Sequence, residues 1–97
     1  MIYAACRNRL EAEKIAKHLL NKKLIACANY FPVNSMYLWK GKLTKDKEYV
    51  LLMKTDKSFA LVCREIEGIH SYEIPCIEKI DAKYNKKFQE WMMKELK

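Results

Sequence analysis

The sequence contains few glycines and few arginines, and each shortage excludes a class of protein. Gly41 and Gly68 are the only glycines in 97 residues, so no glycine-rich loop is available to cradle a phosphate or a dinucleotide. Only three of the 19 basic residues are arginine, whereas dedicated base and phosphate readers rely on the bidentate guanidinium group. The formal charge of +7 therefore identifies no partner. Scattered lysines indicate a solvated surface, with an anion or nucleic-acid footprint as the alternative.

Long apolar runs are also absent. No stretch approaches the roughly 20 apolar residues that span a bilayer, and the N-terminus lacks the charged segment that opens a signal peptide. We therefore expect no membrane contact and a cytoplasmic location. Apolar residues nevertheless make up 51% of the chain, which argues against disorder. At this length the composition predicts one domain, over residues 1–97.

The chain has four cysteines but no Cys-x-x-Cys pair. Their spacing is not that of a structural zinc site, and without a secretory signal a disulfide framework is not expected. Cys27 and Cys63 are predicted to be small buried hydrophobes. The sequence pattern alone leaves the roles of Cys6 and Cys76 open.

Apolar periodicity predicts three helices and four strands. Asn8 followed by Glu11 resembles a capping box for the first helix, and Asp56 or Ser58 is expected to cap the second. Pro32 is expected to bend the second strand, because proline removes a ladder donor. The predicted helices cover residues 9–23, 59–67 and 85–96, and the predicted strands cover residues 1–7, 24–31 with a continuation at 35–40, 48–55 and 76–80.

This order, β-α-β-β-α-β plus a terminal helix, predicts an α+β fold of the ferredoxin-like split β-α-β type, with the helices on one face of the sheet. The second and third strands carry too many apolar and aromatic residues for a face exposed to water. We therefore expect the long hairpin to associate with other copies of the chain. The alternative is that the terminal helix covers this surface.

Candidates for catalysis are few. His70 with Cys6 or Cys76 is the only Cys–His combination that would supply a nucleophile and a base, and no carboxylate pair stands out. Arg7 and Arg9 follow the first strand, as an acylphosphatase would require, but the glycine-rich loop of that enzyme is missing. The residues do not predict an enzyme.

A metal site is the more specific hypothesis. The predicted topology sets the end of the first strand beside the fourth, which would bring Cys6, His70 and Cys76 together. One imidazole and two thiolates suit Cu(I) or Zn(II). The alternative is that His70 and Tyr72 shape a loop while the cysteines fill the core.

Five blocks of the sequence, in order, resemble the motifs of the CutA divalent-cation-tolerance family. They span most of the chain: Lys23-Leu-Ile-Ala-Cys-Ala-Asn-Tyr-Phe-Pro32, Ser35-Met-Tyr-Leu-Trp-Lys-Gly-Lys-Leu43, Leu52-Met-Lys-Thr55, His70-Ser-Tyr-Glu-Ile-Pro75, and Phe88 with Trp91.

The resemblance implies a ferredoxin-like protomer assembled into a trimer through its long hairpins, with a role in copper or divalent-cation tolerance and no established enzymatic activity. In bacterial members a copper site is proposed from a cysteine that ends the first strand and a His-His pair. Those positions fall on Cys6, Ile69 and His70 here. The replacement of the first histidine shifts the implied site towards thiolate ligands from Cys6 and Cys76.

Three functions are weighed from the sequence. The first is a non-enzymatic cytoplasmic homotrimer that binds copper or another divalent cation in metal tolerance or signalling. The second is a trimeric regulatory module that binds a small ligand or a partner protein at its inter-subunit clefts. The third, nucleic-acid binding, is not expected because the aromatic motif with which this fold stacks RNA bases is missing.

Overall fold

The structure is a computed structural model that describes all 97 residues. It contains four strands and three helices, in the predicted order. The strands are β1 (Ile2–Cys6), β2 (Cys27–Trp39), β3 (Lys42–Lys54) and β4 (Ile77–Lys79), and the helices are α1 (Arg9–Asn21), α2 (Phe59–Glu67) and α3 (Lys86–Glu95).

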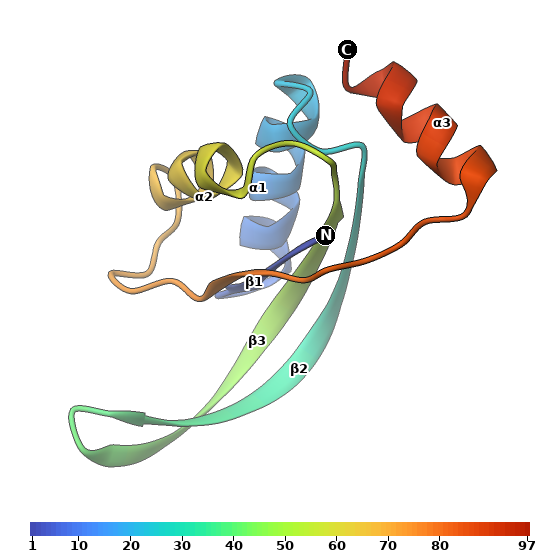
Figure 1. Ribbon diagram of the computed structural model, residues 1–97. Helices are drawn as coiled ribbons and strands as arrows, with labels where there is room; N and C mark the ends of the chain where they lie inside the picture. The colour runs from blue at the N-terminus through green and yellow to red at the C-terminus, as the bar shows by residue number, and fades with distance from the viewer.

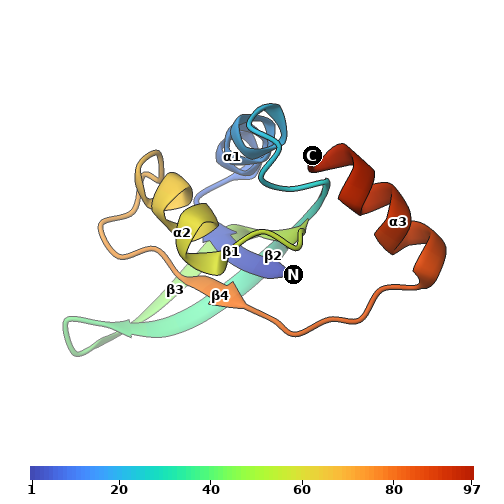
Figure 2. The same ribbon diagram turned by 45° about the horizontal axis from the view of Figure 1, so that its top comes forward.

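The strands form one antiparallel sheet in the order β2-β3-β1-β4. Helices α1 and α2 lie side by side on one face of it (Figures 1 and 2). This arrangement confirms the predicted ferredoxin-like α+β fold. Each β-α-β unit is split by a strand of the other unit: β1 lies between β3 and β4, since Ile2 pairs with both Met53 of β3 and Lys79 of β4.

Local signals set the helix boundaries where the sequence indicated. The side chain of Asn8 accepts a hydrogen bond from the Glu11 N–H at 2.9 Å and so caps α1. Ser58, rather than Asp56, caps α2 through a bond from the Leu61 N–H. These caps satisfy N–H groups that have no partner within the first turn of each helix.

The hairpin of β2 and β3 is longer and more regular than predicted. Its strands pair without interruption from Cys27 with Lys54 to Trp39 with Lys42. The expected bend at Pro32 is wrong, because β2 is an edge strand of the sheet and an edge strand tolerates a missing donor. The two strands are joined by Lys40 and Gly41, whose positive φ values of 50° and 80° are those of a tight type I′ hairpin turn.

The two faces of the sheet differ because successive side chains on a strand point in opposite directions. Ile2, Ala4 and Cys6 of β1 pack under the helices in the hydrophobic core, together with Leu51 and Met53 of β3. Tyr3 and Ala5 point to the other face, which neither α1 nor α2 covers. Cys27 and Cys63 were predicted to be buried, and this prediction is corrected, because both residues are only half-buried.

Helix α3 does not cover the hairpin. Met92 of this helix and Leu96, which follows it, are buried, and α3 lies at the end of the molecule opposite the hairpin tip (Figures 1 and 2). Leu38 and Leu43, near the tip, therefore remain 72% and 67% exposed. The hairpin surface that the sequence marked as too apolar for water has no cover within one chain.

Candidate functional site

A compact polar cluster lies where β1 ends. The Sγ of Cys6, a carboxylate oxygen of Glu11 and a ring nitrogen of His70 all lie within 4.8 Å of one another. Cys6 is the last residue of β1, Glu11 belongs to the first turn of α1, and His70 follows α2. The cluster therefore joins three segments, and of the predicted ligand set it contains Cys6 and His70.

The His70 side chain is fully buried, and both of its ring nitrogens are engaged. Nε2 donates to the carbonyl oxygen of Ala5 at 2.7 Å, and Nδ1 accepts from the Tyr72 N–H at 3.0 Å. These partners assign the neutral Nε2–H tautomer. A metal ion would find no free lone pair on this ring unless the Tyr72 N–H moved away.

Glu11 holds the loop after α2 against the start of α1. Its Oε1 accepts from the Arg7 N–H at 2.8 Å and its Oε2 from the Ser71 N–H at 2.9 Å. Burial alone would raise the pKa of this carboxyl, but hydrogen bonds from the Arg7 backbone and from the side chain and backbone of Ser71 outweigh burial, so its pKa is lowered. Glu11 is therefore a charged, doubly bonded clamp between segments 60 residues apart.

Cys6 is completely buried. Burial, with smaller effects from Glu11 and Glu48, raises the pKa of its thiol to about 12. The thiolate is the form that binds metal ions, and it is strongly disfavoured here. With the thiol protonated and the donor atoms of Glu11 and His70 engaged by backbone groups, a metal ion would enter the cluster only by displacing the thiol proton and some of these hydrogen bonds.

Cys76, the third predicted ligand, lies apart from this cluster. Its carbonyl oxygen accepts from the Ala5 N–H, so it stands beside Ala5, on the sheet face opposite Cys6. Its exposed thiol donates to Glu78 at 3.1 Å, and burial and Glu78 raise its pKa to about 11. Glu11, the third member of the cluster with Cys6 and His70, was not predicted from the sequence. Its spacing from Asn8 fits a capping box, and that role was the one assigned to it.

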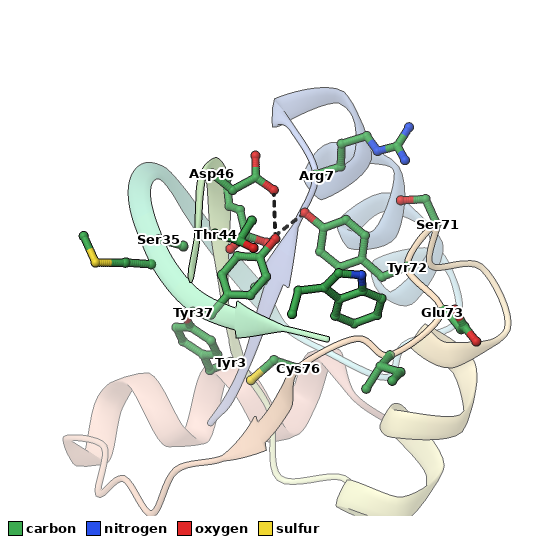
Figure 3. Close-up of a pocket in the computed structure, with 15 residues that line it drawn as sticks. Tyr3, Arg7, Ser35, Tyr37, Thr44, Asp46, Ser71, Tyr72, Glu73 and Cys76 are labelled. Atoms are coloured by element: carbon green, nitrogen blue, oxygen red, sulfur yellow. Dashed lines mark hydrogen bonds between the residues drawn. The ribbon is translucent and has the colours of Figure 1, made fainter. Parts of the chain in front are cut away.

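The opposite face of the sheet carries a groove of about 560 Å³. It lies between β1, the curled end of the hairpin and the loop before β4 (Figure 3). Two tyrosines from different segments meet carboxylates of β3 in it: the Tyr37 hydroxyl donates to Asp46 at 3.2 Å and the Tyr72 hydroxyl to Glu48 at 2.8 Å. Cys76 also lines this groove.

Fold and site together define a small ferredoxin-like α+β protein with a projecting hairpin. Residues 1–95 match the family described as CutA1 divalent ion tolerance protein. The chain belongs to this family, which confirms the resemblance found in the sequence. The family is one of divalent-cation tolerance proteins and is not a known enzyme family.

Two archaeal relatives match across nearly their whole length. The divalent-cation tolerance protein CutA of Archaeoglobus fulgidus is 42% identical over 93 residues, which cover 94% of this chain and 91% of that protein. The protein of the same name from Pyrococcus horikoshii is 34% identical over 99 residues, covering 100% of this chain and 97% of its own.

Solved structures share the same fold. The structure described as the periplasmic divalent cation tolerance protein CutA from Archaeoglobus fulgidus superposes with a TM-score of 0.95 at 39% identity, over 99% of this chain and 96% of that one. A protein of a Nostoc species, described as a PII-like protein CutA in apo form, gives 0.81 at 28% identity, over 95% and 88%. In the present structure no helix has the length and apolar character needed to cross a membrane.

Proposed function

We propose that the protein acts in divalent-cation tolerance as a cytoplasmic homotrimer, one domain per protomer, and performs no enzymatic step. The observation that carries the proposal is the uncovered hairpin. Seven of the large hydrophobic side chains exposed on the molecule belong to it: Tyr30, Phe31, Met36, Tyr37, Leu38, Trp39 and Leu43. A surface of this kind on a small chain is typical of an interface between copies.

Sedimentation at micromolar concentration tests the assembly, with a matched pair of variants. Leu38 in the hairpin and Leu10 in α1 are each 72% exposed, so an aspartate at either position should be tolerated by the fold of one chain. We expect the parent and Leu10→Asp to sediment as trimers, and Leu38→Asp to dissociate. A monomeric parent, or equal behaviour of the two variants, would refute assembly through the hairpin.

Copper is the metal we propose, with Cys6 and His70 as ligands. Support comes from their separation of at most 4.8 Å and from the affinity of thiolate and imidazole donors for soft ions. Glu11 is the third potential ligand within 4.8 Å of Cys6 and His70. Cys76, predicted as the third ligand, would have to move from the other face of the sheet. Binding should be weak, because the ion must displace the thiol proton and existing hydrogen bonds.

Calorimetric titration with Cu(I) and Cu(II) tests this ligand set. The double variant Cys6→Ser/His70→Ala should lose most of the heat of binding, while Cys76→Ser should keep it. Far-ultraviolet circular dichroism checks that each variant is folded. Equal binding by the folded double variant and the parent would show that the ligands lie elsewhere, and loss of binding in Cys76→Ser would restore that residue as a ligand.

The second candidate function is a regulatory module that binds a small ligand in clefts between subunits, with metal binding incidental. The groove of about 560 Å³ favours it, because ligand sites in proteins are concavities of this size and assembly through the hairpin would place this groove beside a neighbouring subunit. The description of the Nostoc relative as PII-like points in the same direction.

Two further expectations concern the cellular location of the protein and its binding to nucleic acid. Cell fractionation should recover the protein with the cytoplasm; recovery from the periplasm, the location given for the Archaeoglobus fulgidus relative, would overturn this. Retention on single-stranded RNA should be negligible at physiological salt. Strong retention that falls steeply with salt would instead revive nucleic-acid binding.

A further inference from the structure

The outer half of the hairpin extends beyond the rest of the sheet. Strand β1 stops pairing with β3 at Cys6 and Tyr49, whereas β2 and β3 stay paired as far as the turn. Residues 33–39 and 42–48 therefore project past β1 as a two-stranded ribbon (Figure 1), and we call them the hairpin arm. A ribbon of two strands has little to fix its direction, because no third strand or helix supports it.

One side-chain hydrogen bond joins the hairpin arm to the rest of the chain. The Tyr72 hydroxyl donates at 2.8 Å to Glu48, the last residue of the arm before β3 enters the sheet. The other side-chain hydrogen bonds of the arm, such as that from Tyr37 to Asp46, stay within it. Burial and the bond to Glu48 raise the pKa of Tyr72, so its phenol stays protonated and donates. Tyr72 therefore anchors the arm at its root.

Tyr72 also occupies the lone pair of His70. Its N–H donates to Nδ1 of His70 at 3.0 Å, and the centroids of the two rings are 4.8 Å apart. Nδ1 carries the lone pair of the ring, because Nε2 donates to the Ala5 carbonyl. Nδ1 also lies 3.9 Å from a carboxylate oxygen of Glu11, so it faces the cluster. One residue thus contacts the cluster through its backbone and the hairpin arm through its hydroxyl.

A cation bound to Nδ1 of His70 would break both contacts. A lone pair serves one partner at a time, so the ion must displace the Tyr72 N–H. A shift of Tyr72 by about 1 Å would lengthen the 2.8 Å bond between its hydroxyl and Glu48 beyond the roughly 3.5 Å at which a hydrogen bond is lost. The hairpin arm would then lose its anchor.

We propose that Tyr72 couples the metal cluster to the hairpin arm. In the anchored state Tyr72 is bonded to both His70 and Glu48, and in the released state, which a soft cation on His70 favours, it is bonded to neither. The proposal rests on the proposed copper function and adds the regulation of that site. The arm carries Leu38 and Trp39 of the surface proposed for assembly, so binding of the ion alters the direction of that surface. Coupling of this kind is reciprocal.

Hydrogen exchange followed by mass spectrometry measures the hairpin arm with and without Cu(I). We expect Cu(I) to speed exchange of the arm's amides by roughly threefold or more. Tyr72→Phe keeps the backbone N–H but lacks the hydroxyl, so its arm should exchange at the faster rate without metal, and Cu(I) should add nothing. Tyr84→Phe is the matched control, because the Tyr84 hydroxyl has no hydrogen-bond partner, and it should behave as the parent does.

Calorimetric titration with Cu(I) measures the same coupling from the cluster. Tyr72→Phe should bind Cu(I) roughly tenfold more tightly than the parent, because the ion no longer has to break the bond to Glu48. A residue that only maintained the structure of the cluster would weaken binding when substituted, so the direction of the change identifies the coupling. Tyr84→Phe should bind as the parent does.

The outcomes separate this proposal from the copper function. If Cu(I) binds the parent but leaves exchange of the arm unchanged, or speeds it equally in Tyr72→Phe, the coupling is wrong while the metal site stands. Equal or weaker binding by folded Tyr72→Phe likewise overturns the coupling. If Cu(I) does not bind the parent, the copper function and its coupling fail together. Cys6→Ser/His70→Ala should show no effect of Cu(I) on the arm, and an effect there would refute control through His70.

Discussion

Substitution of Glu11 by glutamine removes the charge from the clamp between α1 and the loop that begins at His70. In the parent, the two carboxylate oxygens accept from the N–H groups of Arg7 and Ser71. Glutamine retains one acceptor oxygen and brings an NH₂ group in place of the other. One of the two backbone N–H groups then faces the NH₂ donor, so its hydrogen bond is lost. The other hydrogen bond is weakened, because its acceptor no longer carries a charge.

The magnitude follows from the bonds that are lost. A hydrogen bond to a charged group contributes roughly 1.5–3 kcal/mol to stability, and the Glu11 side chain is only 11% exposed. The expected loss is about 2 kcal/mol in the free energy of unfolding. In a domain of this length, about 1 kcal/mol shifts the melting temperature by roughly 4–8 °C, so Glu11→Gln should melt roughly 8–16 °C lower.

The assay is urea unfolding of parent and variant at equal protein concentration, followed as a function of pH. The carboxyl has a lowered pKa in the folded state. Its contribution is therefore present above the unfolded value of about 4.3 and is lost as the pH falls through the folded pKa. The difference between parent and variant should be full at pH 7 and shrink below pH 4.

Glu95→Gln, on the exposed side of α3, serves as the control and should change stability by no more than about 0.5 kcal/mol. A loss below about 0.5 kcal/mol for Glu11→Gln, or a loss that persists unchanged at pH 3, would refute the clamp.

Further predictions concern the core, the backbone and the buried thiol. Leu51→Ala should destabilise the protein by about 2–5 kcal/mol, because Leu51 is fully buried, whereas Leu10→Ala at an exposed position should be near neutral in the same urea titration. Gly41→Ala, at φ +80°, should lower stability by about 1 kcal/mol through backbone strain alone, since nothing lies within 4 Å of the added Cβ. Gly68→Ala, with a helical φ of −67°, should be neutral or slightly stabilising by the same measurement. Cys6 should react with a maleimide at pH 8 only after urea unfolds the chain, as mass spectrometry of the labelled peptides would show; rapid labelling of native protein would contradict its burial.

Local features of the fold could be predicted from the sequence, and contacts between distant segments could not. The caps at Asn8 and Ser58 depend on residues three positions away, so they are visible in the chain. The bend expected at Pro32 failed because it depends on whether β2 lies at the edge of the sheet, which only the completed sheet decides.

The candidate site also contains contacts that could be predicted from the sequence and contacts that could not. The sequence brought Cys6 and His70 together correctly, because the topology sets the end of β1 beside the loop after α2. Cys76 was misplaced because the register of β4 against β1 decides which face each residue occupies, and a shift of one residue reverses it. The second role of Glu11 depends on Ser71, which no local pattern connects to it.

The position of β1 has a consequence for biosynthesis. This strand is synthesised before the other three, yet it lies in the interior of the sheet, between β3 and β4. Ile2 meets Met53 and then Lys79, and a ribosome adds roughly 5–20 residues per second. Strand β1 must therefore wait several seconds, unpaired on one side, while the locally paired β2–β3 hairpin is already able to close. Its protection during synthesis depends on how early α1 and β3 fold against it.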